Sequence, residues 1–317
     1  MKAMVIYEPG SPEKFVLEER AIPSVKEGWT LVKIKGFGIN HSEIFTRKGL
    51  SPTVQFPRIL GIECVGQVVE TTRRDLQEGQ KIVSIMGEMG RAYDGSYAEY
   101  ALLPNEQIYP VDSQLSWAEL AAIPETYYTA FGSFKNMQIK EGDSILVRAA
   151  TSGVGLAFLK LVKAQFPQNR VVGSVRSLAK KDLLQQQGFD EIILDERGVL
   201  QTEEKFDKIL ELVGPATLKN SFDHIQSAGI ICNTGQLGGK WYVEEFDPIV
   251  EIRNNSYLTN FYSGNVHQQL IDELFSYIDA YKINVSPQRI FSLEQIPAAH
   301  SYIESQAGFG KVVVLNN

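Results

Sequence analysis

Cysteine is almost absent from this chain. The two that occur, Cys64 and Cys232, stand far apart and form neither a CxxC nor a CxxH spacing. A disulfide-stapled domain or a zinc finger needs several cysteines at short, regular intervals, so the sequence fits neither class. We expect both thiols to be small buried core residues.

The chain also lacks an excess of positive charge and a long apolar run. Its 31 Lys and Arg against 38 Asp and Glu give a net charge of −7, whereas a nucleic-acid surface needs clustered basic residues. No stretch reaches the roughly 18 consecutive apolar residues of a membrane helix, and Glu8, Pro9 and Gly10 interrupt any early signal sequence. We therefore expect a cytoplasmic protein that binds a small molecule, with no nucleic-acid and no membrane partner.

The remaining composition is that of an ordinary globular protein of about two domains, with 317 residues, 44% apolar and 22% charged. Its first part reads as short strands separated by turns that contain Gly or Pro. In residues 30–38, for example, Val32 and Ile34 alternate with lysines at period two. This pattern predicts a β-rich first domain over residues 1–117.

At Ser116 the apolar period changes from that of strands to that of helices. Ser116 and Glu119 have the spacing of a capping box at a helix start. Beyond them, apolar strand-like runs alternate with helix-like runs, which is typical of a parallel sheet covered on both faces. We predict a doubly wound α/β domain over residues 118–255. A helix-like segment at 268–281 and a strand-like one at 310–315 follow, and these could return to pack on the first domain.

The strongest local signal for chemistry is the glycine-containing turn in residues 145–158, ILVRAATSGVGLAF. A strand that turns tightly into a helix presents backbone N–H groups and the positive end of the helix to one spot, where a pyrophosphate binds well. The strict GxGxxG pattern is absent, because Ala149 stands where its first glycine is expected. Such a turn also occurs without any ligand, but the strand–helix–strand context favours binding. The loop residues expected at the phosphates are Ser152, Gly153, Val154 and Gly155.

The end of the following strand predicts which cofactor binds. NAD-binding folds place Asp or Glu about 20 residues after the loop, to accept hydrogen bonds from the ribose 2′-OH. Here the segment contains hydroxyl and basic side chains and no acid before Asp182; these side chains are Ser174, Arg176, Ser177, Lys180 and Lys181. They can bind a 2′-phosphate, so they favour NADP(H). The alternative is a solvated helix start, although positive charge is unfavourable there without an anion.

The order of these segments resembles the medium-chain dehydrogenase/reductase superfamily, and within it the zinc-independent quinone oxidoreductase branch. The resemblance covers nearly the whole length and is carried by GINHSEIFTRKG, FPRILGIECVGQVVE, EGQKIVSIMG, DGSYAEY, ILVRAATSGVGLAF, FDKILELVG and GKVVVL. It implies a GroES-like catalytic domain over 1–117, completed by 256–317, and a Rossmann domain over 118–255. It also implies a homodimer.

The resemblance bears on the question of a metal. Zinc-dependent members carry Cys and His at the positions that read Asn40 and Ile62 here, and the cysteine-rich lobe of those relatives is missing. Asn and Ile cannot replace a thiolate and an imidazole around Zn²⁺. Glu63 and Cys64 are neighbours on a predicted strand and face opposite ways, so they cannot easily share an ion. We expect no metal: Glu63 caps or pairs locally, and Cys64 packs.

His41 and Glu43 complete the set of side chains that could be proposed as ligands. We expect His41 to be an ordinary turn residue. Glu43 replaces the Asp, and Phe45 the Tyr, of a motif in quinone-reducing relatives. The loss of that phenol removes one possible hydrogen-bond donor to a substrate.

Several site residues are implied by the resemblance alone. Asn40 is expected near the nicotinamide and the acceptor, and Thr129 under the cofactor, although Asn40 could instead shape a turn and Thr129 bond back within its helix. Asp195 is expected near the adenine. Neighbours of the nicotinamide half are expected at Gly235, Leu237, Phe261 and Lys311, where loop and packing roles are the alternatives.

Without a metal, hydride transfer to a conjugated acceptor is easier than alcohol oxidation, because the developing charge spreads through an enolate or a quinone ring. The sequence therefore predicts an NADPH-dependent reductase of quinones or α,β-unsaturated carbonyls. One alternative is an NADPH-binding redox-sensing or interaction protein with little turnover. A metal-dependent alcohol dehydrogenase is the other, and would require bound zinc.

Overall fold

The structure is a computed structural model that describes residues 1–305 and 307–316. The chain divides into two compact units. Unit 1 contains Met1–Tyr128, Ser263–Tyr277 and Val285–Asn317, and unit 2 contains Thr129–Tyr262 and Ile278–Asn284. None of the helices in the described ranges combines the length and the hydropathy needed to cross a membrane.

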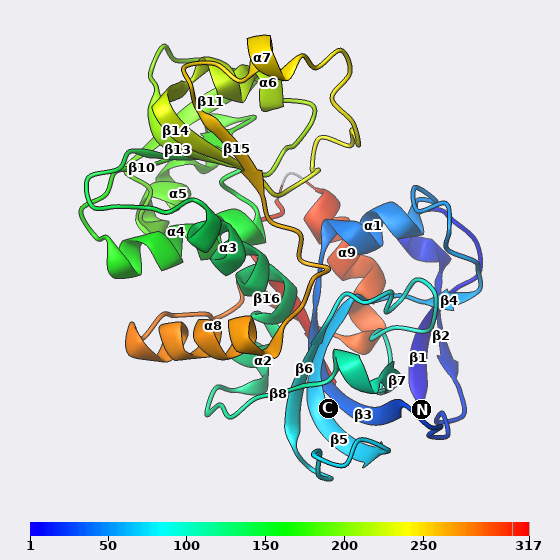
Figure 1. The fold of residues 1–317 in the computed structure, drawn as a ribbon. Coiled ribbons are helices and arrows are strands. Elements are labelled where there is room, and N and C mark those ends of the chain that lie inside the picture. The colour runs from blue at the N-terminus through cyan, green and yellow to red at the C-terminus, as the bar shows by residue number, and fades with distance from the viewer. Residues whose placement is uncertain (306, 317) are drawn as a thin grey trace. The chain divides into compact units, whose positions relative to one another are not determined.

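Unit 1 is built on β-sheets, as its period-two pattern predicts (Figure 1). Its large sheet has the order β16-β17-β3-β5-β6-β8, with β7 paired to β3. The strands are β3 (Trp29–Ile39), β5 (Glu63–Thr71), β6 (Lys81–Ile85), β7 (Tyr100–Pro104), β8 (Tyr109–Pro110), β16 (Arg289–Ser292) and β17 (Val312–Leu315). A smaller sheet has the order β2-β1-β4, from β1 (Lys2–Ile6), β2 (Phe15–Glu19) and β4 (Arg58–Ile59).

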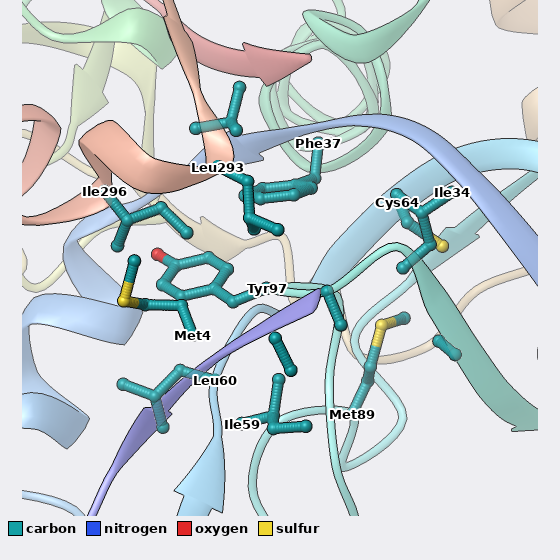
Figure 2. Close-up of a cluster of buried hydrophobic side chains, with 14 of the residues drawn as sticks. Met4, Ile34, Phe37, Ile59, Leu60, Cys64, Met89, Tyr97, Leu293 and Ile296 are labelled. Carbon is teal, nitrogen blue, oxygen red and sulfur yellow. The ribbon is translucent and has the colours of Figure 1, made fainter. Parts of the chain in front are cut away.

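The C-terminal segment completes this unit. β17 pairs antiparallel with β3, so residues near position 312 lie beside Ile39. The helices are α1 (His41–Arg47), α2 (Trp117–Ala121), α9 (Ile296–Glu304) and most of α8 (Gln268–Ala280). The core contains Phe37, Cys64 and Tyr97, and the rings of Phe37 and Tyr97 stack with centroids 5.1 Å apart (Figure 2). Cys64 is therefore the buried core residue that the sequence predicts.

Unit 2 is a Rossmann domain. Its sheet has the order β12-β11-β10-β9-β13-β14-β15, and all neighbours are parallel except β12 and β11. The strands are β9 (Ile145–Val147), β10 (Val171–Val175), β11 (Glu191–Glu196), β12 (Val199–Leu200), β13 (Phe206–Glu211), β14 (Ile225–Asn233) and β15 (Tyr257–Asn260). Numbered along the chain from β9, the six parallel strands have the order 3-2-1-4-5-6 of dinucleotide-binding sheets. Strands β10 and β11 lie on one side of β9, and β13, β14 and β15 lie on the other. A ligand is expected beyond the carboxyl end of β9.

Capping residues mark some of the helix ends in unit 2. They are α3 (Pro124–Asn136, from Thr129 on), α4 (Gly153–Gln165), α5 (Lys181–Gln187), α6 (Leu218–Asp223) and α7 (Pro248–Glu251). Gly188 ends α5 with φ of 114°, a left-handed conformation that glycine adopts without a Cβ penalty. In unit 1, Ser116 and Glu119 form the predicted capping box of α2.

The expected boundaries at residues 118 and 255 differ from this division. Helix α2 packs on β3 and β17 and so belongs to unit 1. At the other end, β15 adds a sixth parallel strand to the Rossmann sheet, and unit 2 runs on to Tyr262. Amphipathic helices have the same apolar spacing in both units. The periodicity of the sequence therefore shows where strands give way to helices, but it does not show which residue ends each unit.

Candidate functional site

The phosphate loop of unit 2 joins β9 to α4. Ala149 adopts φ of 61°, the left-handed region that glycine favours, so the backbone keeps the turn although the expected glycine is absent. Ser152 is the N-cap of α4, and its Oγ accepts a hydrogen bond from the Gly155 N–H at 3.1 Å. A Cβ on Gly155 would lie 3.1 Å from the Ala149 carbonyl oxygen, so the close turn favours glycine. Gly153 and Val154 form the first turn of the helix.

The carboxyl end of β10 lies next to this loop, since the Ala150 N–H donates to the Ser174 carbonyl at 3.0 Å. Ser174 is 1% exposed, and its hydroxyl has no hydrogen-bond partner within the described residues. Arg176 and Ser177 are exposed, and Ser177 caps the following 3₁₀ turn. Partial burial lowers the pKa of Lys180. This strand end therefore combines the buried Ser174 hydroxyl with accessible basic groups.

Three other predicted residues gather around α3 and the end of β14. Thr129 is buried on α3, where its carbonyl accepts a hydrogen bond from Ser133 Oγ at 2.8 Å. The ring of Phe261 covers Gly132, where a Cβ would lie 2.0 Å from the ring. A Cβ on Gly235 would lie 2.1 Å from the Leu212 carbonyl oxygen. Both close approaches require glycine.

Leu237 follows in the same loop, and its N–H donates to the Leu212 carbonyl at 3.1 Å. Ser133 Oγ also lies 2.9 Å from Thr234 Oγ1, which ties α3 to the residue after β14. Thr129, Gly235, Leu237 and Phe261 thus occupy one region of unit 2.

Asp195 is a buried acid that is paired within the Rossmann domain. It lies on β11, is 6% exposed, and accepts hydrogen bonds from Arg148 Nε and Nη2 at 3.2 and 2.5 Å. Arg148 is fully buried, and its Nη1 also donates to Ser221 Oγ at 3.0 Å and lies 3.8 Å from Glu211 Oε2. Any contact of Asp195 with adenine remains a prediction.

Arg148 was missed by the sequence reasoning. Its one signal is a charged residue directly between an apolar strand and the phosphate loop, in ILVRAATSGVG. Because a buried guanidinium must be paired, this position predicts acids at neighbouring strand ends without identifying them.

Unit 1 holds a buried polar cluster at the amino end of α1, which we call the lysine–glutamate cluster: Asn40, Glu43, Glu63 and Lys311. Lys311 Nζ donates to Glu63 Oε1 at 2.6 Å and to Asn40 Oδ1 at 2.8 Å. Asn40 Nδ2 donates to the same Glu63 oxygen at 2.8 Å. Lys311 and Glu63 are 5% and 0% exposed. The structure therefore brings Asn40 and Lys311 into direct contact.

Glu63 also binds the amino end of α3, because its Oε2 accepts a hydrogen bond from the Glu125 N–H in the first turn of that helix at 2.7 Å. A carboxylate is favourable at this positive helix end. Glu63 therefore pairs and caps as predicted, but not locally, because its partners Lys311 and Glu125 lie 248 and 62 positions away in the chain. Cys64, its neighbour on β5, lies in the apolar core, where burial raises the pKa of its thiol.

Glu43 is the second carboxyl group of the lysine–glutamate cluster and is 1% exposed. Its Oε2 accepts from the Asn40 N–H at 3.2 Å and its Oε1 from the Ile62 N–H at 3.4 Å. Burial, together with the nearby charge of Glu63, raises the pKa of Glu43 to about 8. His41 is exposed in the first turn of α1, and no set of three or more His, Cys, Asp or Glu side chains in the described ranges could hold a metal ion.

Comparisons with known proteins agree with this architecture. Residues 26–113 match the model of the alcohol dehydrogenase GroES-like domain, and residues 187–314 match that of the zinc-binding dehydrogenase. A quinone oxidoreductase of Sus scrofa is 23% identical over 332 residues, covering 99% of this chain and 98% of that protein. The chain belongs to the medium-chain dehydrogenase/reductase superfamily, in its quinone oxidoreductase-like branch.

Two further comparisons are with a curated reductase and with a solved structure. A 2-methylene-furan-3-one reductase of Solanum lycopersicum is 26% identical over 329 residues, covering 99% of this chain and 79% of that protein. The structure of mycobacterial Rv1454c complexed with NADPH superimposes with a TM-score of 0.83 over the full length of both chains, at 22% identity, which shows the shared fold. Membership makes this chain a nicotinamide-dependent oxidoreductase.

Proposed function

We propose that this superfamily member is an NADPH-dependent reductase that transfers hydride to a quinone or an α,β-unsaturated carbonyl without zinc. The observation that carries the choice of cofactor is the end of β10. There, accessible Arg176 and Ser177 adjoin the buried hydroxyl of Ser174, which has no hydrogen-bond partner among the described residues. A 2′-phosphate would pair with the guanidinium and the hydroxyls, and residues 174–181 contain no acid that would repel it. The relative with bound NADPH supports the same assignment.

The residues of unit 2 fit a dinucleotide. The left-handed Ala149 and the N-cap Ser152 shape a loop at the start of a 13-residue helix, where the N-terminal N–H groups would bind the pyrophosphate. Gly235 and Leu237 would border the nicotinamide half, with Thr129 and Phe261 from the same region. When bound, NADPH supplies the hydride.

The residues of unit 1 do not fit zinc. Asn40 and Ile62 stand at the Cys and His positions, and the ammonium of Lys311 binds Asn40 directly. An amide and an alkyl side chain are poor partners for Zn²⁺, and an adjacent ammonium disfavours a second cation. Lys311, held by Glu63, would instead provide fixed positive charge and hydrogen bonding, which suits an acceptor that delocalises its own negative charge.

The test is NADPH consumption with a panel of quinones, enones, alkenals and nitro compounds. Saturable turnover on quinones or enones supports the proposal. NADPH binding without turnover across the whole panel would favour the alternative of a redox-sensing or interaction protein, for which Phe45 in place of the tyrosine is the supporting feature. Stoichiometric zinc with chelator-sensitive alcohol oxidation would favour the metal-dependent enzyme.

Replacing Arg176 with Ala is expected to raise the KM for NADPH about tenfold, because a charge-assisted hydrogen bond is worth roughly 1.5 kcal/mol or more. The KM for NADH should change little, since NADH lacks the 2′-phosphate. Steady-state kinetics with both cofactors measure the difference. Lys205→Ala is the matched control, because exposed Lys205 precedes β13 at the amino ends of the parallel strands, whereas Arg176 follows β10 at their carboxyl ends. Equal effects of Arg176→Ala on both cofactors would contradict the assignment.

We also propose that the protein is a homodimer formed through β15. In the described residues the Rossmann sheet ends at β15, where Tyr257 and Leu258 are 60% and 38% exposed. An apolar sheet edge is a ready surface for strand pairing. Wild-type protein should elute as a dimer in size-exclusion chromatography with light scattering, and Tyr257→Lys with Leu258→Lys should elute as a monomer. A monomeric wild type at micromolar concentration would refute the dimer.

A further inference from the structure

The lysine–glutamate cluster contains one more carboxyl group than ammonium groups. Glu43 and Glu63 are both buried, and Lys311 is the cation that hydrogen-bonds within the cluster. Burying two carboxylates beside one ammonium leaves an uncompensated charge, which is costly away from water. One of the two carboxyl groups is therefore expected to retain a proton.

The hydrogen bonds identify which group keeps the proton. Glu63 accepts three short bonds, from Lys311 at 2.6 Å, Asn40 Nδ2 at 2.8 Å and the Glu125 N–H at 2.7 Å. Glu43 accepts longer bonds from backbone N–H groups, at 3.2 and 3.4 Å, and lies 3.5 Å from Asn40 Nδ2. Strong donors stabilise the ionised form, so Glu63 is the anion. The pKa of Glu43, which burial raises to about 8, agrees with Glu43 as the protonated group.

The other groups around Glu43 do not supply the missing positive charge. Tyr97, in the segment before β7, interacts electrostatically with both glutamates. Burial together with these two glutamates raises the pKa of its phenol well above the usual value, so the phenol stays neutral. Arg47, on the same helix as Glu43, pairs with Glu304 and donates to the Gly10 carbonyl at 2.7 Å. His300 hydrogen-bonds the Tyr97 hydroxyl at 2.9 Å, and burial lowers its pKa to about 3, so it is neutral too.

Asn40 links Glu43 to the ammonium. Its backbone N–H binds Glu43, its Nδ2 lies between the two carboxyl groups, and its Oδ1 accepts from Lys311. With Glu43 neutral, Asn40 and Lys311 both turn toward Glu63. An ionised Glu43 would attract the same amide and ammonium hydrogens and compete with Glu63 for them.

We propose that Glu43 is a positioning residue that acts as a neutral carboxylic acid, orienting Asn40 and Lys311, and that its ionisation disorganises this arrangement. The inference rests on the proposed reductase for its effect on turnover. The side chain of Glu43 also reaches the backbone N–H of Ile62 on the neighbouring segment, which fixes the carboxyl group within the cluster.

The test compares the wild type with Glu43→Gln, which keeps the size of the side chain and cannot ionise. Wild-type kcat/KM should fall about tenfold per pH unit above pH 8, as expected for loss of one essential proton. Glu43→Gln should have near wild-type kcat/KM at pH 7 and a flat profile to pH 9. An inactive Glu43→Gln at pH 7, or the same alkaline fall in both proteins, would overturn the proposal.

A second readout does not depend on turnover. Because the pKa of Glu43 is higher in the folded than in the unfolded chain, the folded state holds an extra proton between about pH 4.5 and 8. The stability that this proton provides is complete below the unfolded pKa and is lost as pH rises to 8. The unfolding constant of the wild type should therefore increase, relative to that of Glu43→Gln, by up to tenfold per pH unit across this window.

These two readouts separate the inference from the proposed function. If no acceptor is turned over but the relative unfolding constants show the slope, the reductase proposal fails and the proton on Glu43 stands. If an acceptor is turned over but the unfolding constants of the wild type and of Glu43→Gln depend on pH in the same way, the reductase proposal stands and the inference about Glu43 is refuted. If Glu43→Gln does not fold, NMR of wild-type protein labelled at glutamate side-chain carboxyl carbons decides: one carboxyl titrating near pH 8 supports the inference, and all titrating in the ordinary acid range overturns it.

Discussion

Arg148→Met is expected to lower the free energy of unfolding by about 3–5 kcal/mol, the usual effect of removing one partner from a buried ion pair. The guanidinium is fully buried and binds Asp195 on β11, Ser221 on α6 and the carbonyls of Thr217 and Gly198. Methionine fills much of the volume and leaves the Asp195 carboxylate without its cation. Urea unfolding followed by circular dichroism measures the loss.

Two controls separate buried pairing from the general loss of an arginine. Arg170→Met removes a guanidinium that pairs with Glu191 and Glu204 at partly exposed positions, and should cost at most about 1 kcal/mol. Adding Asp195→Leu to Arg148→Met should recover part of the lost stability, because the Asp195 carboxylate is then gone and Glu211 keeps its hydrogen bonds from Ser221 Oγ and two backbone N–H groups. An Arg148→Met protein that unfolds within about 1 kcal/mol of the wild type would show that Asp195 is satisfied without Arg148.

The architecture of both units follows from local sequence signals. Alternating apolar residues predict β3, and near-continuous apolar runs between amphipathic helices predict the parallel sheet of unit 2. Capping residues locate the ends of individual helices, as Ser116 and Gly188 do. These signals are reliable because each one acts within a few residues of the structure that it specifies.

The phosphate loop shows a limit of motif reading. Ala149 breaks the glycine pattern, yet its backbone takes the left-handed conformation at φ of 61°. The sheet order and the strand–helix turn decide this geometry, and alanine tolerates it at a modest energetic cost. A strict motif search would have missed a loop that the surrounding fold imposes.

The lysine–glutamate cluster could not be predicted as a cluster. Lys311 and Glu63 are 248 positions apart, and they meet because β17 pairs with β3, which also pairs with β5. Each residue alone has an ordinary interpretation, and the resemblance suggested only that Asn40 and Lys311 lie near one ligand. The extra carboxyl group, and with it the proton on Glu43, is visible only when the four side chains are placed together.

Gly38→Ala is expected to disrupt the lysine–glutamate cluster with a single methyl group. Gly38 lies on β3, where a Cβ would stand 2.2 Å from Lys311 Cε and Nζ and 2.3 Å from Glu63 Oε1. The backbone there has no left-handed φ, so alanine brings a purely steric change. Either the ammonium or the carboxylate must move out of a buried, paired position. We expect a loss of about 3 kcal/mol in the free energy of unfolding, from overpacking and a weakened ion pair.

The same substitution should lower kcat/KM for the reductase reaction at least tenfold, because the fixed charge of Lys311 is displaced by about 1 Å or more, a misplacement that costs orders of magnitude in catalysis. Gly10→Ala is the control: its new methyl group would meet only the side chain of Lys14, which is half exposed and can rotate away. That variant should be as active as the wild type and within about 0.5 kcal/mol of its stability. Wild-type activity and stability in Gly38→Ala would mean that Lys311 and Glu63 shift at little cost, and that the reaction does not depend on where they are held.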